Sequence, residues 1–415
     1  MINIKEKKDC CGCSACVQIC PKQCISMSAD NEGFLYPQVN TTICIDCSLC
    51  EKVCPIINQE EPKEPLAIYA ARNSNENIRL KSSSGGIFTL LAEEIIKSGG
   101  VVFGAKFNNN WNVVHDYTET LEGLDAFRGS KYVQSIIGDN FKIAKHFLDD
   151  GRKVLFSGTP CQIAGLKKYL RKEYDNLLTV EVVCHGVPSP MIWQDYLNYK
   201  RTKCAAGKNT VSSSLNELPV ITDISFRDKT YGWKKYSFKI SYATSKAAEK
   251  SVSKSTNTSN CEITPFNKDI FMRGYLKNLY LRPSCYHCVA RQGKSGADMS
   301  IADYWGVQSI HPEIDDDKGT GVVLINTKYG AAYFNSIANQ IKSLRSSYNK
   351  ACAQNPCIVK SVKEPSRRHQ FWQNYPVSKI DSIEEICELM TPSPIVVFAK
   401  RVVLKILKIL KIKRL

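Results

Sequence analysis

Two stretches of the sequence repeat one spacing of cysteines: CCGCSACVQICP at residues 10–21 and CIDCSLCEKVCP at residues 44–55. Each contains the pattern C-x2-C-x2-C-x3-C-P. Three closely spaced thiolates can bind three irons of one 4Fe–4S cubane, and the proline turn directs the fourth thiolate to the other cluster. The repeat therefore predicts a folded module over residues 1–60 that holds two 4Fe–4S clusters. The expected ligands are Cys10, Cys13, Cys16 and Cys54 for the first cluster and Cys44, Cys47, Cys50 and Cys20 for the second.

Zinc is the alternative for this repeat, because C-x2-C pairs also suit tetrahedral zinc sites. A zinc site needs four ligands and no cysteine followed by proline, so the full pattern favours iron–sulfur clusters. The segment resembles a bacterial dicluster ferredoxin in both copies of the repeat. Cys11 and Cys24 fall outside the repeat, and we expect them to be packing residues.

The composition favours a reducing compartment. The chain has 415 residues and 19 cysteines. No apolar run opens the sequence and no stretch is apolar for long enough to cross a membrane, so we expect a cytoplasmic protein without a signal peptide. In the cytoplasm many cysteines indicate metal binding rather than disulfides. With 43% hydrophobic residues the chain can bury several cores, which excludes global disorder, and its length suggests two to four domains.

An α/β pattern follows a charged, proline-containing linker at residues 58–65. Short apolar runs alternate with a segment of helical spacing, which predicts buried strands with functional residues at their carboxyl ends. We assign residues 66–205 to a central α/β domain. The expected strands are IYAARN (68–73), VVFGAKF (101–107), KVLFSG (153–158) and LLTVEVV (177–183), and the expected helix is IFTLLAEEIIKSG (87–99).

A change of composition near Cys204 predicts a second, smaller mixed α/β domain over residues 206–390. Polar stretches at 205–215 and 241–260 are expected to be surface loops. Between them, ITDISFRD (221–228) and KYSFKISY (235–242) alternate as the two strands of an antiparallel hairpin do.

Four further cysteines lie in distinctive settings: GTPCQ (158–162), VCHG (183–186) and PSCYHC (283–288). Two follow predicted strands and two form a C-x2-C pair, so four thiolates on loops could converge on a third 4Fe–4S cluster. Residue types alone favour neither a third cluster nor the alternative, which is that these are buried free cysteines of the kind common in protein cores. The candidate ligands are Cys161, Cys184, Cys285 and Cys288.

Several motifs resemble the family of beta subunits of coenzyme F-420 hydrogenases and dehydrogenases. They are SSSGGIF (82–88), RGSKYVQS (128–135), GTPCQIAGL (158–166), CHGVPSP (184–190) and RPSCYHCVARQGKSGADMSIADYWG (282–306). The resemblance runs from Ala67 to about Gly306, behind the ferredoxin repeat. It implies a flavin and a 4Fe–4S cluster in addition to the N-terminal module, and it favours a third cluster over free cysteines.

A flavin would join one-electron transfer through clusters to two-electron chemistry on an organic substrate. A glycine-containing loop that opens a helix favours a phosphate, although a capped helix start without a ligand is the alternative. Asp303 is the candidate to orient the flavin or move a proton, with turn capping as its alternative. The resemblance implies a flavin, FAD in preference to FMN, held by Ser83, Ser84, Gly85, Gly86, Arg128, Lys131, Tyr132, Gln134, Gly158, Thr159 and Gln162.

A basic tail closes the chain, whose formal net charge is +16. On a helical projection of residues 393–415 the cations lie opposite an apolar arc, which predicts an amphipathic helix at an anionic membrane surface. Docking of this helix on the protein itself is the alternative. Nucleic acid is an unfavoured partner, because the apolar arc is wide and residues 400–415 contain no aromatic side chain.

Together these observations predict an α+β ferredoxin-like module, a central α/β flavin domain, a smaller mixed domain and a basic tail. The expected function is that of a flavin-dependent iron–sulfur oxidoreductase with a small-molecule substrate and a redox partner protein or ferredoxin. The substrate would be coenzyme F-420 or, in a bacterium that lacks it, another molecule, with surface-polysaccharide biosynthesis as one setting. The alternative is an electron-transfer adapter that has no substrate site and feeds a partner enzyme.

Overall fold

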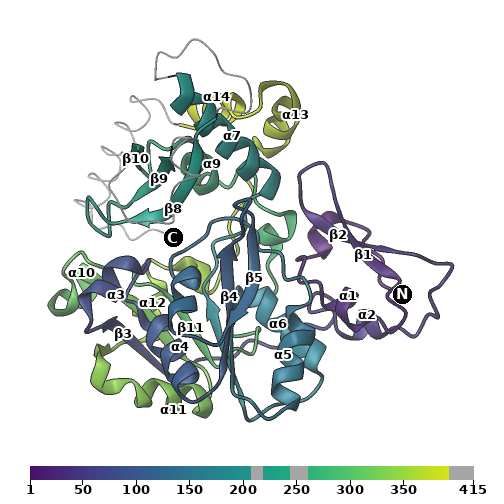
Figure 1. Cartoon of the computed structure of the whole chain (residues 1–415), viewed down its shortest axis with the longest axis vertical. Helices are drawn as coiled ribbons and strands as arrows, with labels where there is room; N and C mark the ends of the chain where they lie inside the picture. Colours follow the sequence, from purple (N-terminus) through teal and green to yellow (C-terminus); the bar gives the residue numbers. More distant parts are fainter. Residues whose placement is uncertain (207–217, 244–259, 392–415) are drawn as a thin grey trace, which may run out of the picture.

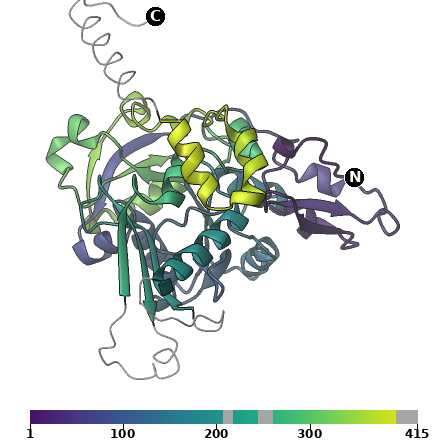
Figure 2. The same ribbon diagram turned by 90° about the horizontal axis from the view of Figure 1, so that it is seen from above.

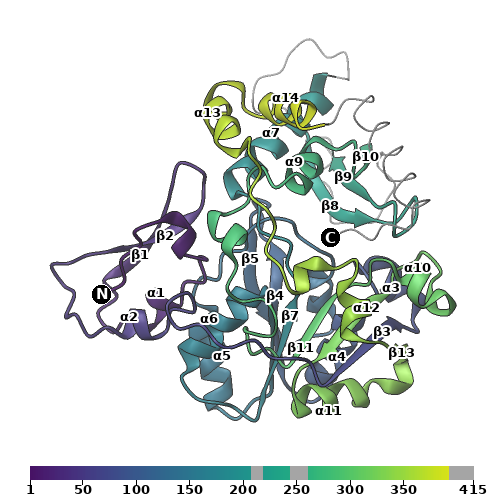
Figure 3. The same cartoon turned by 180° about the vertical axis from the view of Figure 1, so that it is seen from behind.

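The computed structural model describes residues 1–206, 218–243 and 260–391. The chain forms three regions: an N-terminal module, a large sheet covered by helices, and a smaller unit of strands and helices (Figure 1). The view from behind shows the N-terminal module lying beside α5 and α6 of the large sheet (Figure 3).

The N-terminal module has two halves with the same local structure. In each half a short helix, α1 (Ala15–Ile19) or α2 (Leu49–Lys52), begins between the second and third cysteines of the repeat. Each helix follows a serine in the left-handed region, with φ of 62° at Ser14 and 57° at Ser48. An antiparallel pair, β1 (Ile25–Ala29) and β2 (Leu35–Val39), separates the halves. The halves therefore share the geometry that a duplicated sequence would produce.

The large sheet has eight strands in the order β13-β3-β12-β11-β7-β6-β4-β5. Its centre is parallel, with β11, β7, β6 and β4 side by side, and the flanking strands are antiparallel. The central strands bury both faces, as expected for apolar, β-branched parallel strands. The strands are β3 (Ala67–Asn73), β4 (Val101–Phe107), β5 (Val113–Thr118), β6 (Val154–Gly158), β7 (Leu177–Val182), β11 (Met299–Asp303), β12 (Gly321–Ile325) and β13 (Ile341–Arg345).

Helices cover the two faces of this sheet. Helices α4 (Ile87–Lys97) and α11 (Lys328–Ser336) share one core with Val102 of β4, whereas α5 (Asn140–Asp149) and α6 (Pro160–Leu170) share another with Phe103. Neighbouring strand residues thus enter opposite cores, because side chains alternate across a strand. The strands expected at 68–73, 101–107, 153–158 and 177–183 and the helix expected at 87–99 are confirmed within a few residues.

The smaller unit contains an antiparallel sheet in the order β10-β9-β8, which packs with helices α7, α9, α13 and α14 around an aromatic core. The pairing of β8 with β9 confirms the predicted hairpin. The core includes Trp193, Tyr196, Phe226, Phe238 and Phe271. Seen from above, the yellow helices α13 and α14 lie near the middle of the view, and the purple N-terminal module lies to one side (Figure 2). The elements are β8 (Val220–Asp228), β9 (Ser237–Ala243), β10 (Asn260–Pro265), α7 (Pro190–Ala206), α9 (Ile270–Leu276), α13 (Arg368–Ser378) and α14 (Asp381–Leu389).

The boundary that we expected near residue 205 does not divide two folding units. Residues 299–345 return to the large sheet, where β11 pairs with β7 and β12 pairs with β3. Residues 368–389 then rejoin the smaller unit. Polar composition marks a surface segment and gives no information on which sheet the later strands join. The smaller unit therefore combines a segment inserted between β7 and β11 with the later helices α13 and α14.

Short helices complete the described chain. They are η1 (Lys7–Asp9), α3 (Glu76–Lys81), η2 (Glu122–Phe127), η4 (Pro283–His287), α10 (Val307–Ile310), η5 (Pro312–Ile314), η6 (Ala338–Gln340), α12 (Tyr348–Cys352) and η7 (Pro356–Ile358). Within 1–206, 218–243 and 260–391, no helix has both the length and the apolar character to cross a membrane. The predicted tail helix at 393–415 and most of both polar stretches lie outside the described residues.

Candidate functional site

The second set of N-terminal cysteines surrounds one small cavity. Cys20, Cys44, Cys47 and Cys50 all line it, together with Cys24. The sulfur of Cys24 lies 3.3 Å from that of Cys20, and the backbone N–H of Ile2 donates to the Cys50 sulfur over 3.2 Å. Cys47 is exposed at the surface of the module. Four thiols around one cavity are a donor set that fits a 4Fe–4S cubane.

The first set lies in the same module, on the side that faces the large sheet. Burial raises the pKa of the Cys16 thiol to about 12, and the nearby thiols of Cys10 and Cys54 add to this rise. The pKa of Cys13 is also raised: the Cys11 thiol lowers it, but burial and the thiols of Cys16 and Cys54 outweigh this. The four cysteines are therefore close enough to influence each other's charge, although they come from both halves of the repeat.

The third set of cysteines is brought together from three distant segments. Cys161 lies in the first turn of α6, Cys184 follows β7, and Cys285 and Cys288 lie on η4 and at its end. Burial raises the pKa of Cys184 well above its ordinary value, and the thiols of Cys285, Cys161 and Cys288 add to the rise. Burial likewise raises the pKa of Cys285 to about 12. The four thiols thus share one buried region, as a cluster site requires.

Cys11 lies between the first and third sets. Its thiol lies beside those of Cys13 and Cys161: Cys13 and burial raise the pKa of Cys11 well above its ordinary value, and they outweigh the lowering effect of Cys161. The approach is close because α6 has glycine at position 165: a Cβ there would lie 2.8 Å from the Cβ of Cys13. The expectation that Cys11 only packs is therefore incomplete, since it is the thiol that joins two cysteine sets.

Ligand assignment rests on spacing, a shared cavity and electrostatic proximity. In the part of the chain that the structure describes, no three His, Cys, Asp or Glu side chains form a group suited to a single metal ion. Cys204, Cys261, Cys352 and Cys387 have no place in the three sets. Cys357, which no sequence motif singled out, lies near Cys288 and 3.8 Å from a ring nitrogen of His185.

Buried polar contacts fix the N-terminal module to the rest of the chain. Arg282 donates to the backbone oxygens of Cys10 and Leu35 over 2.7 and 2.9 Å and to Gln134 over 3.0 Å. Gln134 in turn donates to the backbone oxygen of Cys11 over 3.1 Å. We expected Gln134 to contact a flavin, but its side chain is used at this junction instead, because residue 134 of the segment faces the module.

A cavity of about 290 Å³ opens at the carboxyl ends of β6, β7 and β11. Its size and position are typical of small-molecule sites in α/β proteins. Cys184 of the third cysteine set is part of its wall. The wall also includes these residues that we expected to hold a flavin or act beside it: Ser83, Ser84, Gly85, Gly86, Arg128, Lys131, Tyr132, Gly158, Thr159, Gln162 and Asp303.

One side of the cavity carries a cation that has no carboxylate partner among the described residues. Lys131 is within hydrogen-bond reach there of the backbone oxygens of Arg128 and Gly129 only, at 3.3 and 3.1 Å. Its side chain is part-buried, and burial lowers the pKa of Lys131 to about 7. The neighbouring Arg128 differs, because it forms an ion pair with Asp125 over 2.5 Å. Lys131 is therefore the cation that a bound phosphate could use.

A chain of hydrogen bonds runs behind the cavity from His115 to the start of α6. Ser135 Oγ lies 2.9 Å from His115 Nδ1 and accepts from Gln162 over 2.8 Å. Gln162 and Thr159 form a capping box at the N-terminus of α6. Burial lowers the pKa of His115 to about 4, against the effect of its bond to Ser157. Sequence reasoning missed His115, although its place in the alternating run VVHDYT (113–118) was a signal for an inward histidine.

Asp303 lies at the end of β11 in an ion pair with the buried Arg227, at 2.6 Å. Trp233 Nε1 also donates to Asp303, over 3.1 Å, and Arg227 donates to the hydroxyl of Tyr132 over 3.1 Å. Tyr132 stacks on Tyr275 in the cavity wall, with ring centroids 4.9 Å apart. Asp303 is thus held in place by two donors from the smaller unit, which brings both parts of the chain to the cavity.

The serine loop is held by its own hydroxyls. Ser83 accepts from the backbone N–H of Ser130 over 2.6 Å, and Ser84 donates to the backbone oxygen of Thr320 over 2.9 Å. The following Gly86 has φ of 77° and caps α4. These contacts leave the start of α4 facing the cavity. A helix N-terminus beside the Lys131 amine fits an anionic, phosphate-bearing ligand.

Comparison with known protein families finds matches for two segments of the chain. Residues 9–56 match the family described as "4Fe-4S dicluster domain". Residues 151–346 match the family described as the C terminus of the beta subunit of coenzyme F420 hydrogenase/dehydrogenase. The chain therefore contains one segment similar to 4Fe–4S dicluster domains and another similar to the C terminus of F420 hydrogenase/dehydrogenase beta subunits. These two matches confirm the resemblance seen in the sequence.

Two curated relatives show the same pair of similarities. Over 162 residues the chain is 22% identical to the F subunit of the F(420)H(2) dehydrogenase of Methanosarcina mazei. This match covers 37% of this chain and 46% of the relative. Over 43 residues it is 40% identical to the ferredoxin 7Fe of Hydrogenibacillus schlegelii, which covers 10% of this chain and 49% of the relative. The chain spans about half the length of the curated relatives it matches.

A solved structure of the F420-reducing NiFe hydrogenase complex from Methanosarcina barkeri is also similar. The match covers 78% of this chain and 92% of the solved chain, with 17% sequence identity and a TM-score of 0.43.

Proposed function

We propose that this protein is a flavin-dependent iron–sulfur oxidoreductase that passes electrons between ferredoxin-type clusters and a small-molecule substrate. The observation that carries the proposal is the position of the third cysteine set. Cys161 contacts Cys11 at the N-terminal module, and Cys184 is part of the wall of the cavity. One buried group of thiols therefore touches both the dicluster module and the small-molecule site.

The order of the cysteine sets supports a route for electrons. The set with Cys20 and the exposed Cys47 is the outermost, the set with Cys10 and Cys16 faces α6, and the third set adjoins the cavity. A redox partner protein or a ferredoxin would exchange electrons at the outermost set. The direction of flow depends on the potentials of the partner and the substrate.

The cavity has the features that a flavin requires, with FAD preferred over FMN. Lys131 and the start of α4 would bind phosphate, and Ser83, Ser84, Gly158 and Thr159 would shape the wall beside it. A bound flavin supplies the exchange between one-electron and two-electron chemistry. Asp303, held by its ion pair with Arg227, lies in the cavity wall, where it would orient the substrate or the flavin.

Coenzyme F-420 is one candidate substrate, since the name of the Methanosarcina mazei relative contains its reduced form. In an organism that lacks this coenzyme we propose another small molecule, with a lipid-linked saccharide as a class that would suit the basic tail. The presence of a cavity of about 290 Å³ favours an enzyme over an adapter, because an adapter needs no small-molecule site.

Replacement of Cys285 by Ser tests the proposal. Anaerobically reconstituted wild-type protein should hold about twelve irons and about twelve sulfides, as three cubanes require. Cys285→Ser should lose about four of each while the N-terminal clusters remain. Reduction of the bound flavin by electrons supplied to the N-terminal clusters should slow at least about tenfold, which is about 1.4 kcal/mol in barrier.

Cys352→Ser is the matched control, because Cys352 is a part-buried cysteine outside the three sets. It should retain all iron and full flavin reduction. Unchanged iron in Cys285→Ser would remove that ligand from the proposal. Wild-type protein that takes up clusters but no flavin would favour the adapter.

A further inference from the structure

Arg282 is a fully buried guanidinium that has no carboxylate partner among the described residues. Its exposed fraction is 0%, and its donors are taken by two backbone oxygens and the amide oxygen of Gln134. The rings of Tyr36 and Phe34 lie 4.3 and 5.5 Å from its central carbon. The acidic groups that act on it are thiols and a phenol: burial lowers the pKa of Arg282, and Cys10, Tyr36, Cys11 and Cys285 raise it above its ordinary value.

Arg291 is the second arginine of this kind. Two of its nitrogens donate to the backbone oxygens of Cys357 and His185, and its buried Nε has no hydrogen-bond partner within the described ranges. Glu181 is in the same region, but the carboxylate accepts from Ser295 and Ser300 and forms no ion pair with Arg291. The thiols that raise the pKa of Arg291, against the effect of burial, are Cys288, Cys184, Cys357 and Cys285.

Other arginines at comparable depth are paired with carboxylates. Arg79 pairs with Asp316, Arg227 with Asp303, and Arg368 with Glu32. A buried cation without an anion is costly, so an unpaired arginine implies an anion that binds beside it. Arg282 and Arg291 both lack a carboxylate in the described chain and both lie among cysteines of the proposed ligand sets. Four thiolates on iron and sulfide give a cluster of net negative charge, which supplies the missing anion.

We propose that Arg282 and Arg291 are the counter-charges that set the reduction potentials of the inner clusters. Arg282 serves both the cluster at Cys10 and the cluster at Cys285, and Arg291 serves the latter alone. Reduction adds one electron to a cluster and so makes it more negative. A fixed cation nearby stabilises the reduced form more than the oxidised form, because net charge and hydrogen bonding set cluster potentials. The inference rests on the proposed function for the third cluster and on the dicluster domain for the first.

The test is a redox titration of the full-length, reconstituted protein with dithionite, followed by electron paramagnetic resonance of each reduced cluster. Arg282→Gln should lower the potentials of the clusters at Cys10 and Cys285 and leave that at Cys47 unchanged. Arg291→Gln should lower only that at Cys285. At a fixed applied potential the ratio of reduced to oxidised cluster should fall at least about tenfold, which is about 59 mV for a one-electron couple.

Two further variants distinguish the effect of the charge of Arg282 from the effect of its hydrogen bonds to the N-terminal module. Arg282→Lys retains the charge and should keep both potentials near wild type, although it loses the branched set of donors. Arg368→Gln is the matched control: Arg368 also fixes the N-terminal module, through Glu32 in the β1–β2 turn, but its charge is neutralised there. It should leave all three potentials unchanged.

Equal shifts in Arg282→Lys and Arg282→Gln, or a shift of the same size in Arg368→Gln, would overturn the inference and leave Arg282 as an attachment residue. If Arg282→Gln does not retain its clusters, Arg291→Gln still tests the inference: an unchanged potential of the cluster at Cys285 in that variant would overturn the inference. Failure of the proposed function has a different signature: wild-type protein would hold only two clusters. The shift expected at the Cys10 cluster would still test Arg282 in that case.

Discussion

Lys131 is a cation at the wall of the cavity whose amine, among the described residues, hydrogen-bonds to backbone oxygens only. Burial lowers its pKa to about 7, from an ordinary value of 10.5. In flavin-free protein the amine therefore loses its proton as the pH rises through about 7. A bound phosphate would favour the charged form and raise the pKa again.

Binding of a phosphate-bearing flavin should consequently weaken as the pH rises above about 7, by at most about tenfold per pH unit for one linked proton. Lys131→Met should bind flavin about tenfold more weakly than wild type at about pH 6, since a charge-assisted bond contributes roughly 1.5–3 kcal/mol. The two proteins should bind equally by about pH 9, where the wild-type amine is neutral. Titration of flavin-free protein, followed by flavin fluorescence, measures both curves.

Lys131→Arg is the control for this prediction, because arginine keeps its charge over the whole range. Its affinity should not fall between about pH 6 and about pH 9. A ratio of wild-type to Lys131→Met affinity that stays constant with pH would show that the amine does not act through its charge.

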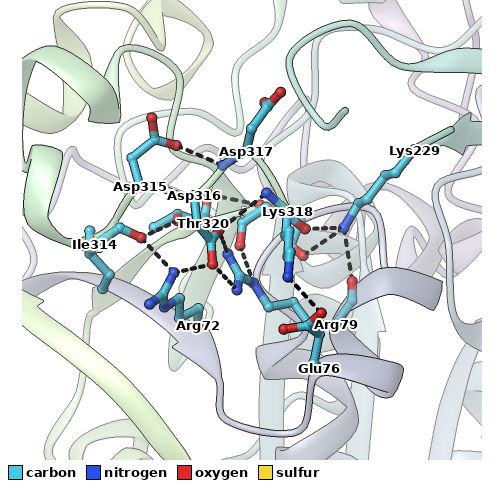
Figure 4. A network of polar contacts seen from close by, with 12 residues as sticks. Arg72, Glu76, Arg79, Lys229, Ile314, Asp315, Asp316, Asp317, Lys318 and Thr320 are labelled. Carbon is cyan, nitrogen blue, oxygen red and sulfur yellow. Dashed lines mark hydrogen bonds and ion pairs between the residues drawn. The ribbon is translucent and has the colours of Figure 1, made fainter. Parts of the chain in front are cut away.

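At the scale of elements, the loop after η5 holds three parts of the chain together (Figure 4). Asp316 pairs with Arg79 of α3 and with Arg72 of β3, and Arg79 also donates to the backbone oxygen of Gly319 over 2.7 Å. Lys229, between β8 and β9, donates to the backbone oxygens of Arg79 and Lys318. The network fixes the hairpin of the smaller unit beside the serine loop of the cavity.

Asp316→Asn should destabilise the protein by about 3–5 kcal/mol, because it leaves the buried Arg79 without an anion. Burial raises the pKa of Asp316, but the hydrogen bonds and charges of Arg79 and Arg72 outweigh burial and lower it to about 2. Denaturant titration of the variant measures the free energy of unfolding. Glu76→Gln is the control, since Glu76 pairs with Lys318 at the exposed edge of the network and should cost under about 1 kcal/mol. Equal losses in the two variants would contradict this account.

At the scale of the whole molecule, the N-terminal module contacts the rest of the chain on the side of its inner cysteines. α1 packs against α6 and α5, and Arg368 and Arg282 reach the module from the later part of the sequence. The outermost cysteines remain at the free end, where Cys47 is exposed. Under the proposed function, a redox partner would bind at this free end and the substrate would bind in the cavity.

The basic tail at 393–415 stays a prediction, because it lies outside the described residues. Deletion of residues 393–415 should leave clusters and flavin intact and abolish sedimentation of the protein with anionic liposomes. Each lysine or arginine near such a surface contributes on the order of 1 kcal/mol, and salt should weaken the binding by screening. Full-length protein that ignores anionic liposomes at low salt would place the tail on its own fold or on a protein partner.

Local patterns in the sequence determined the parts of this protein that depend on neighbouring residues. The duplicated cysteine spacing predicted the dicluster domain, because ligand spacing within a short loop is a property of the local chain. Short apolar runs located β3, β4, β6 and β7, since a strand that is buried on both faces is apolar at successive residues. The residues that follow such strands, among them Gly158 and Cys184, were therefore recognisable as candidates for the cavity wall.

Tertiary structure alone decided which distant segments meet. Residues 299–345 rejoin the sheet beside β7 and β3 because edge pairing and packing select their neighbours, which composition does not reveal. Cys11 joins two cysteine sets only because Gly165 lets α6 approach Cys13. Arg282 contacts the backbone oxygen of Cys10, which lies 272 residues away in the sequence, so only the folded chain brings this arginine beside the cysteines. Charge compensation of this kind depends on distances through space, and a single sequence does not contain them.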